Sequence, residues 1–238
     1  MSTTKYCEIS DISRHNFDTY AYAPIIEPPA LGIKFITLVL KFVQEAFEQS
    51  INISRHQEQL SDSIYYNIYP NEHYRLLKAI VKTINPKIVI DIGTFTGMSC
   101  FAMLQSLRFG SVIHTYDLVQ CNESDNHLDR SMFEDGLIIQ HLCDLSDINT
   151  FNSSKDLLNS ADIIFMDGPK DNVFEYKFLN LLSSISKKSL RILVIDDIKF
   201  KDMLPLWHCI KSPKIDLTSF GHWSGTGLVD ISDGLTLM

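Results

Sequence analysis

The stretch at residues 88–100, IVIDIGTFTGMSC, constrains the fold of this 238-residue chain more than any other. Its unbroken apolar run ending in Asp91 is typical of a strand buried on both faces of a parallel sheet, and helix-like residues 99–107 follow a short turn. Gly93 allows the backbone to turn tightly, and Gly97 allows a cofactor or the sheet to approach where a Cβ would intrude. Because the new helix offers free N–H groups to an anion, we expect a ligand at this turn.

The spacing of this motif, acid-x-Gly-x-x-x-Gly, differs from the Gly-x-Gly-x-x-Gly that binds pyrophosphate in dinucleotide folds. It resembles the first motif of class I S-adenosylmethionine-dependent methyltransferases, in which the anion at the helix is the carboxylate of the methionine part. The resemblance implies cofactor contacts at Asp91, Gly93, Thr94, Gly97 and Ser99. An ordinary glycine-containing turn is the alternative, and a motif standing alone would favour it.

Length and composition indicate one α/β domain with an N-terminal extension. We assign residues 1–68 to an arm and helical extension that acts as a lid or oligomer contact, and residues 69–238 to the cofactor-binding domain. The formal net charge of −8 disfavours a nucleic-acid partner held by phosphate neutralisation. Five cysteines without a C-x-x-C pair argue against a disulfide framework and a zinc site, and favour the cytoplasm. The N-terminus lacks the apolar region of a signal peptide.

The N-terminal third carries weaker patterns. Residues 1–29 include three prolines, which predicts an extended arm. Residues 30–49 place apolar side chains near helical spacing, which predicts an amphipathic helix packed on the body or on a second copy in a homodimer. Its most apolar window, residues 31–47, is short and carries three charges, so no membrane span is expected. Residues 51–67 fit no pattern, and we place them at the mouth of the active site.

From residue 69 onward, strands alternate with helices, which is typical of a doubly wound, Rossmann-like, mostly parallel sheet with helices on both faces. Seven strands are expected, at residues 88–91, 111–117, 137–142, 161–166, 191–195, 214–219 and 227–231. Helices are expected at residues 71–83 with Asn71 as N-cap, 99–107, 172–184 and 202–211, with one short helix between 117 and 137.

Acidic residues follow these strands, at the edge where open α/β sheets bind ligands. Asp117 ends the second strand about twenty residues beyond Gly97, where a carboxylate accepts hydrogen bonds from ribose hydroxyls. Its alternative is a helix N-cap or loop aspartate. Asp144 follows the third strand and is assigned to an adenine amino group, although Asp147 or a backbone group could serve instead.

Asp167 ends the fourth strand, and Asp196 and Asp197 end the fifth. Three carboxylates converging from adjacent strands repel one another, and a divalent cation with oxygen ligands would offset that repulsion. Mg²⁺ is expected, and Ca²⁺ or Mn²⁺ would also suit. The alternatives are protonation with hydrogen bonds from Lys170 and backbone amides, or a helix cap made by the Asp-Asp pair.

The sequences DGPKDN at residues 167–172 and VIDD at residues 194–197 resemble the two metal motifs of cation-dependent O-methyltransferases, the caffeoyl-CoA and catechol group. The similarity runs in order over residues 69–197. It implies that the metal ligands are Asp167, Asp196 and Asp197, that Asp167 also lies at the cofactor, and that Lys170 is the general base.

Three departures qualify the resemblance. Asp197 stands where that group has Asn, and Pro169 stands where the caffeoyl-CoA enzymes carry a second Asp. The tail FGHWSGTG, residues 220–227, resembles instead the ending of a bacterial methyltransferase group that shares the Asp-Gly-Pro-Lys and Asp-Asp motifs. In it, His222 and Trp223 form either an aromatic wall near the strand ends or a packed β-turn.

The expected activity is methyl transfer from S-adenosylmethionine to an oxygen of a small molecule bound at a divalent cation, with Lys170 taking the proton. A metal-independent N- or O-methyltransferase, with His222 or another base, is one alternative. A cofactor-binding protein without turnover is the other.

Overall fold

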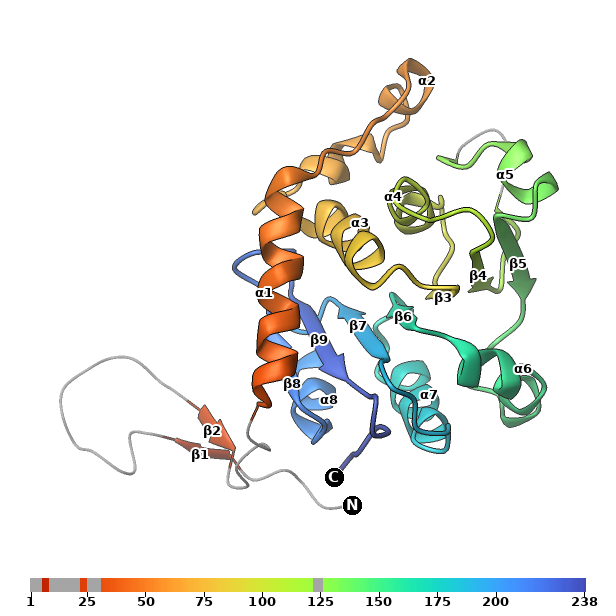
Figure 1. Ribbon diagram of the computed structural model, residues 1–238. Coiled ribbons are helices and arrows are strands. Elements are labelled where there is room, and N and C mark those ends of the chain that lie inside the picture. Colours follow the sequence, from red (N-terminus) through yellow and green to blue (C-terminus); the bar gives the residue numbers. More distant parts are fainter. Residues whose placement is uncertain (1–5, 9–21, 25–30, 122–125) are drawn as a thin grey trace.

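The computed structural model describes residues 6–8, 22–24, 31–121 and 126–238 (Figure 1). The arm predicted at residues 1–29 therefore lies mostly outside the described residues. Two short strands within it are described, β1 (Tyr6–Glu8) and β2 (Tyr22–Pro24), and they pair antiparallel. Among the described helices, none combines the length and the apolar character that a membrane crossing needs.

The main sheet of the described chain has seven strands in the order β5-β4-β3-β6-β7-β9-β8. The strands are β3 (Ile88–Ile92), β4 (Val112–Asp117), β5 (Ile138–Leu142), β6 (Ile163–Met166), β7 (Ile192–Asp196), β8 (Lys214–Asp216) and β9 (Thr226–Asp230). The first five in that order run parallel, and β9 pairs antiparallel with β7 and with β8. The predicted doubly wound, mostly parallel sheet is confirmed.

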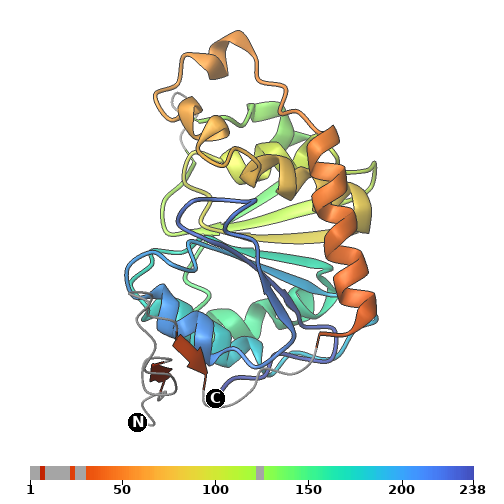
Figure 2. The ribbon, with the colours of Figure 1, turned by 90° about the vertical axis from the view of Figure 1, so that its left-hand side faces the viewer.

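Helices cover both faces of the sheet, which Figure 2 shows close to edge-on. One face packs on α1 (Ile33–Glu48), α3 (His73–Ile84) and α4 (Met98–Leu104). The opposite face packs on α6 (Ile148–Ser160), α7 (Phe174–Leu182) and α8 (Met203–Cys209). Shorter elements are α2 (Arg55–Glu58), the 3₁₀ helix η2 (Ser63–Asn67) and α5 (Arg130–Glu134). The central strands are buried on both sides because each face carries a helical layer.

The predicted amphipathic helix is α1, and it packs on the body of its own chain. Its buried side chains are Phe35, Val39, Phe42 and Ala46, which share one core with α3 and the sheet. The opposite side of α1 leaves Ile33, Leu40 and Phe47 exposed. The apolar period of the helix is thus explained by intramolecular packing. The predicted contact with a second copy remains a prediction.

The structure differs from the sequence expectations in three local details. Asn71 is not the N-cap of α3: its backbone has φ +89°, its buried side-chain oxygen has no hydrogen-bond partner within the described part of the chain, and Glu72 occupies the cap position. Helix α6 was not predicted, because only Phe151 and Leu158 of its thirteen residues are buried and so thin an apolar stripe gives little periodicity. Helix α4 also ends at Leu104 rather than at residue 107.

The order of the strands reverses at β3. The chain proceeds from β3 outward to β4 and β5, then returns to place β6 on the other side of β3. In open α/β sheets, ligands bind in the crevice outside the carboxyl ends of the strands at such a reversal. The turns after β3 and β6 therefore border the expected site.

Candidate active site

Gly93 forms the turn after β3 and brings β3 and β6 together. Its backbone has φ +97°, a region that favours glycine, and a Cβ at this position would lie 2.1 Å from the carbonyl oxygen of Asp167. Its N–H donates to the carbonyl of Tyr116 at 2.9 Å. A side chain here would push apart the ends of two central strands, which explains the glycine.

Gly97 is the N-cap of α4 and has φ +80°. A Cβ there would lie 2.4 Å from Cγ of Leu128. The neighbour that requires a glycine is therefore the side chain of Leu128, which precedes α5, rather than the sheet.

Asp91 lies beneath this turn and is fully buried. Its carboxylate accepts hydrogen bonds from Ser99 Oγ at 2.8 Å, from Cys100 Sγ at 3.2 Å and from the hydroxyl of Thr115. Thr94 joins the network through Thr115, with 2.7 Å between the two hydroxyl oxygens. Burial raises the pKa of Asp91, although the three donors act in the opposite direction. The network fixes the turn from below.

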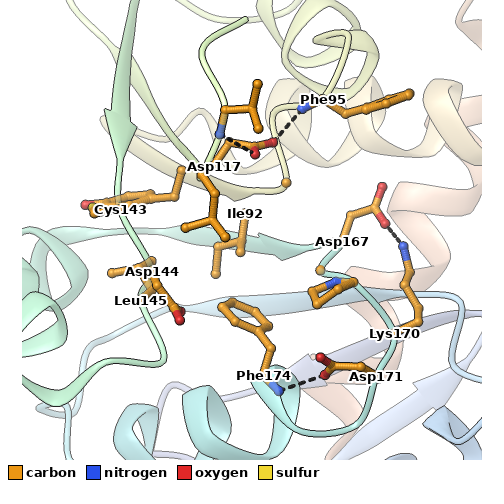
Figure 3. A pocket seen from close by; sticks show the side chains of 16 residues that line it. Ile92, Phe95, Asp117, Cys143, Asp144, Leu145, Asp167, Lys170, Asp171 and Phe174 are labelled. Atoms are coloured by element: carbon orange, nitrogen blue, oxygen red, sulfur yellow. Dashed lines mark hydrogen bonds and ion pairs between the residues drawn. The ribbon is translucent and has the colours of Figure 1, made fainter.

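A cavity of about 710 Å³ opens at the strand reversal (Figure 3). Four of the predicted cofactor residues line it: Gly93, Asp117, Asp144 and Asp167. The other four, Asp91, Thr94, Gly97 and Ser99, lie outside its lining, and their predicted contact with a cofactor remains a prediction. Figure 3 shows Asp117 and Asp144 on one side of the cavity and Asp167 with Lys170 on the other.

Asp117 is positioned by two backbone donors. Its Oδ2 accepts the N–H of Phe95 at 2.9 Å, and its Oδ1 accepts the N–H of Val119 at 3.0 Å. A carboxylate has about four acceptor sites, so each oxygen retains one for a ligand. The first donor comes from the turn after β3, which ties this carboxylate to the motif.

Asp144 and Asp147 have different surroundings. Asp144 accepts the N–H of Ser146 at 2.7 Å and lines the cavity. Asp147 is the N-cap of α6, where its Oδ1 accepts the N–H groups of Asn149 and Thr150. Of the two candidates for an adenine contact, Asp144 is the one at the cavity wall.

A second group of side chains lies beside the cavity, and we name Asp196, Asp197 and His222 the Asp-His cluster. The Nδ1 of His222 lies 3.3 Å from Oδ1 of Asp197 and 3.7 Å from Oδ1 of Asp196. One ligand atom from each of the three residues falls within 4.8 Å of the others. Ser224 donates its hydroxyl to Asp197 and lies 2.6 Å from His222 Nδ1.

Asp167, the expected third acid, lies instead in an ion pair. The Lys170 ammonium contacts Asp167 and is 3.1 Å from Oδ2 of Asp197. The Lys170 backbone has φ +57°, and its N–H donates to the buried side chain of Glu175, which also accepts the N–H of Asn172. Glu175 therefore fixes the loop that carries Lys170.

The charges in the Asp-His cluster reinforce one another. Burial alone would raise the pKa of Asp197, but His222, Lys170 and Ser224 together hold it well below its ordinary range. Burial would lower the pKa of His222, yet the hydrogen bond to Asp197 and the charge of Asp196 raise it. Both shifts in pKa arise in part from the close contact between His222 and Asp197.

His73, at the start of α3, faces the Asp-His cluster. Its Nδ1 lies 3.7 Å from Oδ1 of Asp196, both side chains are at least nine-tenths buried, and neither atom has a hydrogen-bond partner among the described residues. Burial lowers the pKa of His73 although Asp196 opposes the shift, which favours a neutral ring with a free lone pair.

These observations test whether a metal ion fits. Two buried atoms without a described partner, His73 Nδ1 and Asp196 Oδ1, lie 3.7 Å apart. The separations of 3.3 and 3.7 Å between His222 and the two carboxylates resemble the roughly 3.4 Å between neighbouring tetrahedral ligands with bonds of about 2.1 Å. Buried polar groups without partners are uncommon in proteins. The donors therefore fit a divalent ion.

Sequence reasoning missed three of these side chains. His73 carries no motif of its own, and Glu175 is an ordinary acid in the first turn of α7. Ser224 lies two residues beyond His222, so its proximity was the one available signal. His222 was expected as part of an aromatic wall or β-turn, or as the base of a metal-independent methyltransferase. It lies at the carboxylates, within a loop where Gly225 N–H also donates to the His222 carbonyl.

The sequence pattern of the O-methyltransferase family matches residues 52–204. A methyltransferase from Geobacter sulfurreducens shows 16% identity over 82% of this chain and 88% of that one, with a TM-score of 0.47. A protein from Staphylococcus aureus assigned as a caffeoyl-CoA O-methyltransferase shows 17% identity over 74% of this chain and 94% of that one, with a TM-score of 0.49. An O-methyltransferase from Bacillus cereus, in complex with S-adenosylhomocysteine (SAH), shows 14% identity over 93% of this chain and 94% of that one, with a TM-score of 0.42.

Among curated proteins, none matches this chain. The family match spans well over half of the sequence. It includes the turn within residues 88–100, which we call the motif turn, as well as the Lys170 loop and the Asp196–Asp197 pair. The chain therefore belongs to the O-methyltransferase family.

Proposed function

We propose that this protein transfers a methyl group from S-adenosylmethionine to an oxygen of a small molecule, with a divalent metal ion bound at the Asp-His cluster. One observation supports this proposal above the others. The Asp167–Lys170 ion pair lines the cavity, and Lys170 also contacts Asp197 of the cluster. The two sites thus share a border where a methyl donor and an acceptor can meet.

S-Adenosylmethionine supplies a methyl group on a positively charged sulfur. In our proposal Asp117 accepts hydrogen bonds from the ribose hydroxyls, and Asp144 accepts one from the adenine amino group. Gly93 keeps the cavity wall clear of side-chain atoms. The buried network of Asp91, Thr94 and Ser99 holds the turn rigid, which keeps the donors and acceptors of the site in fixed positions.

Asp196, Asp197 and His222 would hold the divalent ion, which would lower the pKa of the acceptor hydroxyl. We propose that Lys170, as the neutral amine, accepts the hydroxyl proton, and that Asp167 and Asp197 stabilise the ammonium group so formed. Glu175 fixes the Lys170 backbone. The chain then aligns the reacting oxygen with the methyl carbon, and alignment accounts for much of the rate.

We further propose that residues 69–238 carry the chemistry and that, within residues 1–68, the described segment 51–67 covers the site. Asp62, just before η2, accepts the hydroxyl of Thr96 at 2.6 Å and lies 2.9 Å from Nε2 of His127. Gln57 donates to the His127 carbonyl at 2.7 Å. These contacts hold the covering segment on the motif turn, as expected of a lid over the site.

The test is transfer of radiolabelled methyl from S-adenosylmethionine to a panel of phenols, catechols and other small hydroxyl compounds. Protein stripped of metal by chelator and dialysis should be inactive, and divalent ions should restore activity. Lys170→Met should lower turnover about a hundredfold or more while SAH binding is retained. Arg130→Met, which breaks an exposed ion pair with Glu134, is the matched control and should keep full turnover.

Two results would contradict the proposal. Full activity of stripped protein in excess chelator would leave a metal-independent methyltransferase. Failure to bind either S-adenosylmethionine or SAH would refute the methyl donor itself.

A further inference from the structure

We infer that the Asp-His cluster selects a nitrogen-binding transition-metal ion of the Zn²⁺, Fe²⁺ or Co²⁺ kind and discriminates against Mg²⁺ and Ca²⁺. This inference rests on the proposed function in one respect, that the cluster holds a cation. It replaces the Mg²⁺ expected from the sequence.

The chemistry of the donors carries the first step. Mg²⁺ and Ca²⁺ are held in proteins by oxygen atoms, whereas imidazole nitrogen suits Zn²⁺ and Fe²⁺. In this chain an imidazole nitrogen, that of His222, lies 3.3 and 3.7 Å from the two carboxylates that end β7. The cluster contains no cysteine. The absence of a C-x-x-C pair, which argued against a zinc site, therefore does not apply to a site made of carboxylates and imidazole.

The position of Asp167 carries the second step. An all-oxygen site would need this third carboxylate, but Asp167 is paired with the Lys170 ammonium. Lys170 also binds Oδ2 of Asp197, which leaves the other oxygen of Asp197 for His222. Hard cations gain affinity from the number of free carboxylates, and this arrangement lowers that number.

His73 lies beside these donors and supports the site. Its Nδ1 has no partner among the described residues and lies 3.7 Å from the Asp196 oxygen that His222 also approaches. It is outside the three residues whose ligand atoms fall within 4.8 Å of one another, so it is a neighbour of the ion rather than a ligand. The ring is held in place: its centroid is 4.8 Å from Tyr74, 5.9 Å from Phe165 and 5.2 Å from His222.

The test is a titration of the full-length, metal-stripped protein with Co²⁺, followed by the visible absorption bands of the bound ion. We expect one Co²⁺ per chain with bands typical of mixed nitrogen and oxygen ligation. Zn²⁺ should displace it at comparable concentration, and Mg²⁺ or Ca²⁺ should fail to do so at about a thousandfold excess.

Variants locate the ion. His222→Ala and His73→Ala should each weaken Co²⁺ binding about tenfold to a hundredfold and change the bands. His141→Ala is the matched control: His141 lies 3.0 Å from His114 on the neighbouring strand, a histidine pair remote from the Asp-His cluster in sequence and sheet position. It should leave the titration unchanged. Circular dichroism on each variant establishes that the fold is retained.

SAH binding, measured calorimetrically on the same samples, separates this inference from the proposed function. Displacement of Co²⁺ by Mg²⁺ at similar concentration, with SAH still bound, would overturn the metal selectivity and leave methyl transfer standing. Loss of Co²⁺ binding in His141→Ala, with binding kept in His222→Ala, would overturn the site. Binding of Co²⁺ without any binding of SAH would support the selectivity and refute the methyl donor.

Discussion

The edge of the sheet where the parallel strands end has two halves, one beside β3 and β4 and one beside β7, and their carboxylates have different surroundings. Beside β3 and β4, Asp91 has three side-chain donors and Asp117 has two backbone donors. Beside β7, Asp196 Oδ1 is buried without a partner among the described residues, and Asp197 contacts a lysine, a histidine and a serine. Aspartates thus lie at or near the strand ends in both halves, but only Asp196 of the β7 half keeps a buried oxygen without a described partner.

The difference follows from the donors that each half provides. N–H and hydroxyl groups around the turn after β3 hold the carboxylates in fixed positions, where their remaining lone pairs can accept hydrogen bonds from hydroxyl and amino groups of a ligand. The β7 half has imidazole rings and one ammonium group instead. Its carboxylate oxygens that remain without a hydrogen bond suit a cation. In our proposal the first half recognises the nucleoside and the second half holds the cation.

Gly93→Ala should produce the largest effect, because Gly93 is where the two halves touch. The added Cβ would meet the Asp167 carbonyl at 2.1 Å, and φ is +97°. Strain and steric overlap together should cost about 3 kcal/mol of unfolding free energy or more, measured by urea denaturation, and should abolish SAH binding.

Gly110→Ala is the matched control. It has φ +80° but open space around the position of a Cβ, so only the backbone cost of about 1 kcal/mol is expected. Equal costs for the two substitutions would show that the two strand ends are not in close contact.

Asp117→Ala should weaken SAH binding by about 1 to 3 kcal/mol, through loss of charge-assisted hydrogen bonds. Asp144→Ala should have a smaller effect, since it is assigned one contact. Asp147→Ala, which removes the cap of α6 outside the cavity, and Asp196→Asn in the other half should leave SAH affinity largely unchanged. An equal loss in Asp196→Asn would mean that the halves do not act separately.

Asp62→Ala should cost about 1 to 2 kcal/mol of stability at neutral pH, because the Thr96 hydroxyl and the buried His127 lose their acceptor. Burial would raise the pKa of Asp62, but its hydrogen bonds from Thr96 and His127 lower it overall. The wild-type advantage is therefore present above pH 4, roughly the unfolded pKa, and is lost as pH falls through the folded pKa. Glu58→Ala, at an exposed position of the same segment, should change stability little. A difference independent of pH would contradict the role of the carboxylate.

The smallest expected effect is on the reactivity of Cys143, which lines the cavity and should react more slowly when the cavity is occupied. Burial, followed by the charge of Asp144, raises the pKa of Cys143, and the thiolate is the reactive form. Alkylation by iodoacetamide should thus be slow at neutral pH, rise as pH increases, and be suppressed by SAH. Cys209, on α8 outside the cavity, should show no protection by SAH when the two peptides are compared by mass spectrometry. Equal protection of both would indicate a global effect.

The β3–β4 half could be predicted closely because its signals are local. The apolar run of β3, the two glycines and Asp117 lie within thirty residues, and parallel pairing of β3 with β4 aligns them without further information. Asp144 and Asp147 show where prediction from local signals fails. Both follow β5, and the sequence alone did not separate them, because α6, of which Asp147 is the N-cap, was not predicted.

The β7 half depends on contacts across the chain. Antiparallel pairing places Thr226 opposite Asp196, which returns the loop containing His222 to the end of β7. His73 reaches the same place from α3, more than 120 residues earlier. Neither approach follows from spacing. For the same reason Asp167 was expected as a third metal ligand, whereas its ion pair with Lys170 depends on how Glu175 bends the intervening loop.

The most direct test of the account is a crystal structure of the protein with SAH and Zn²⁺, including an anomalous difference map at the zinc edge. We expect the ribose hydroxyls at Asp117 in the cavity, and one anomalous peak within ligand distance of Asp196, Asp197 and His222. SAH bound away from Asp117, or zinc bound between Asp167 and other oxygen atoms with His222 turned aside, would contradict the division of the sheet edge into a nucleoside half and a cation half.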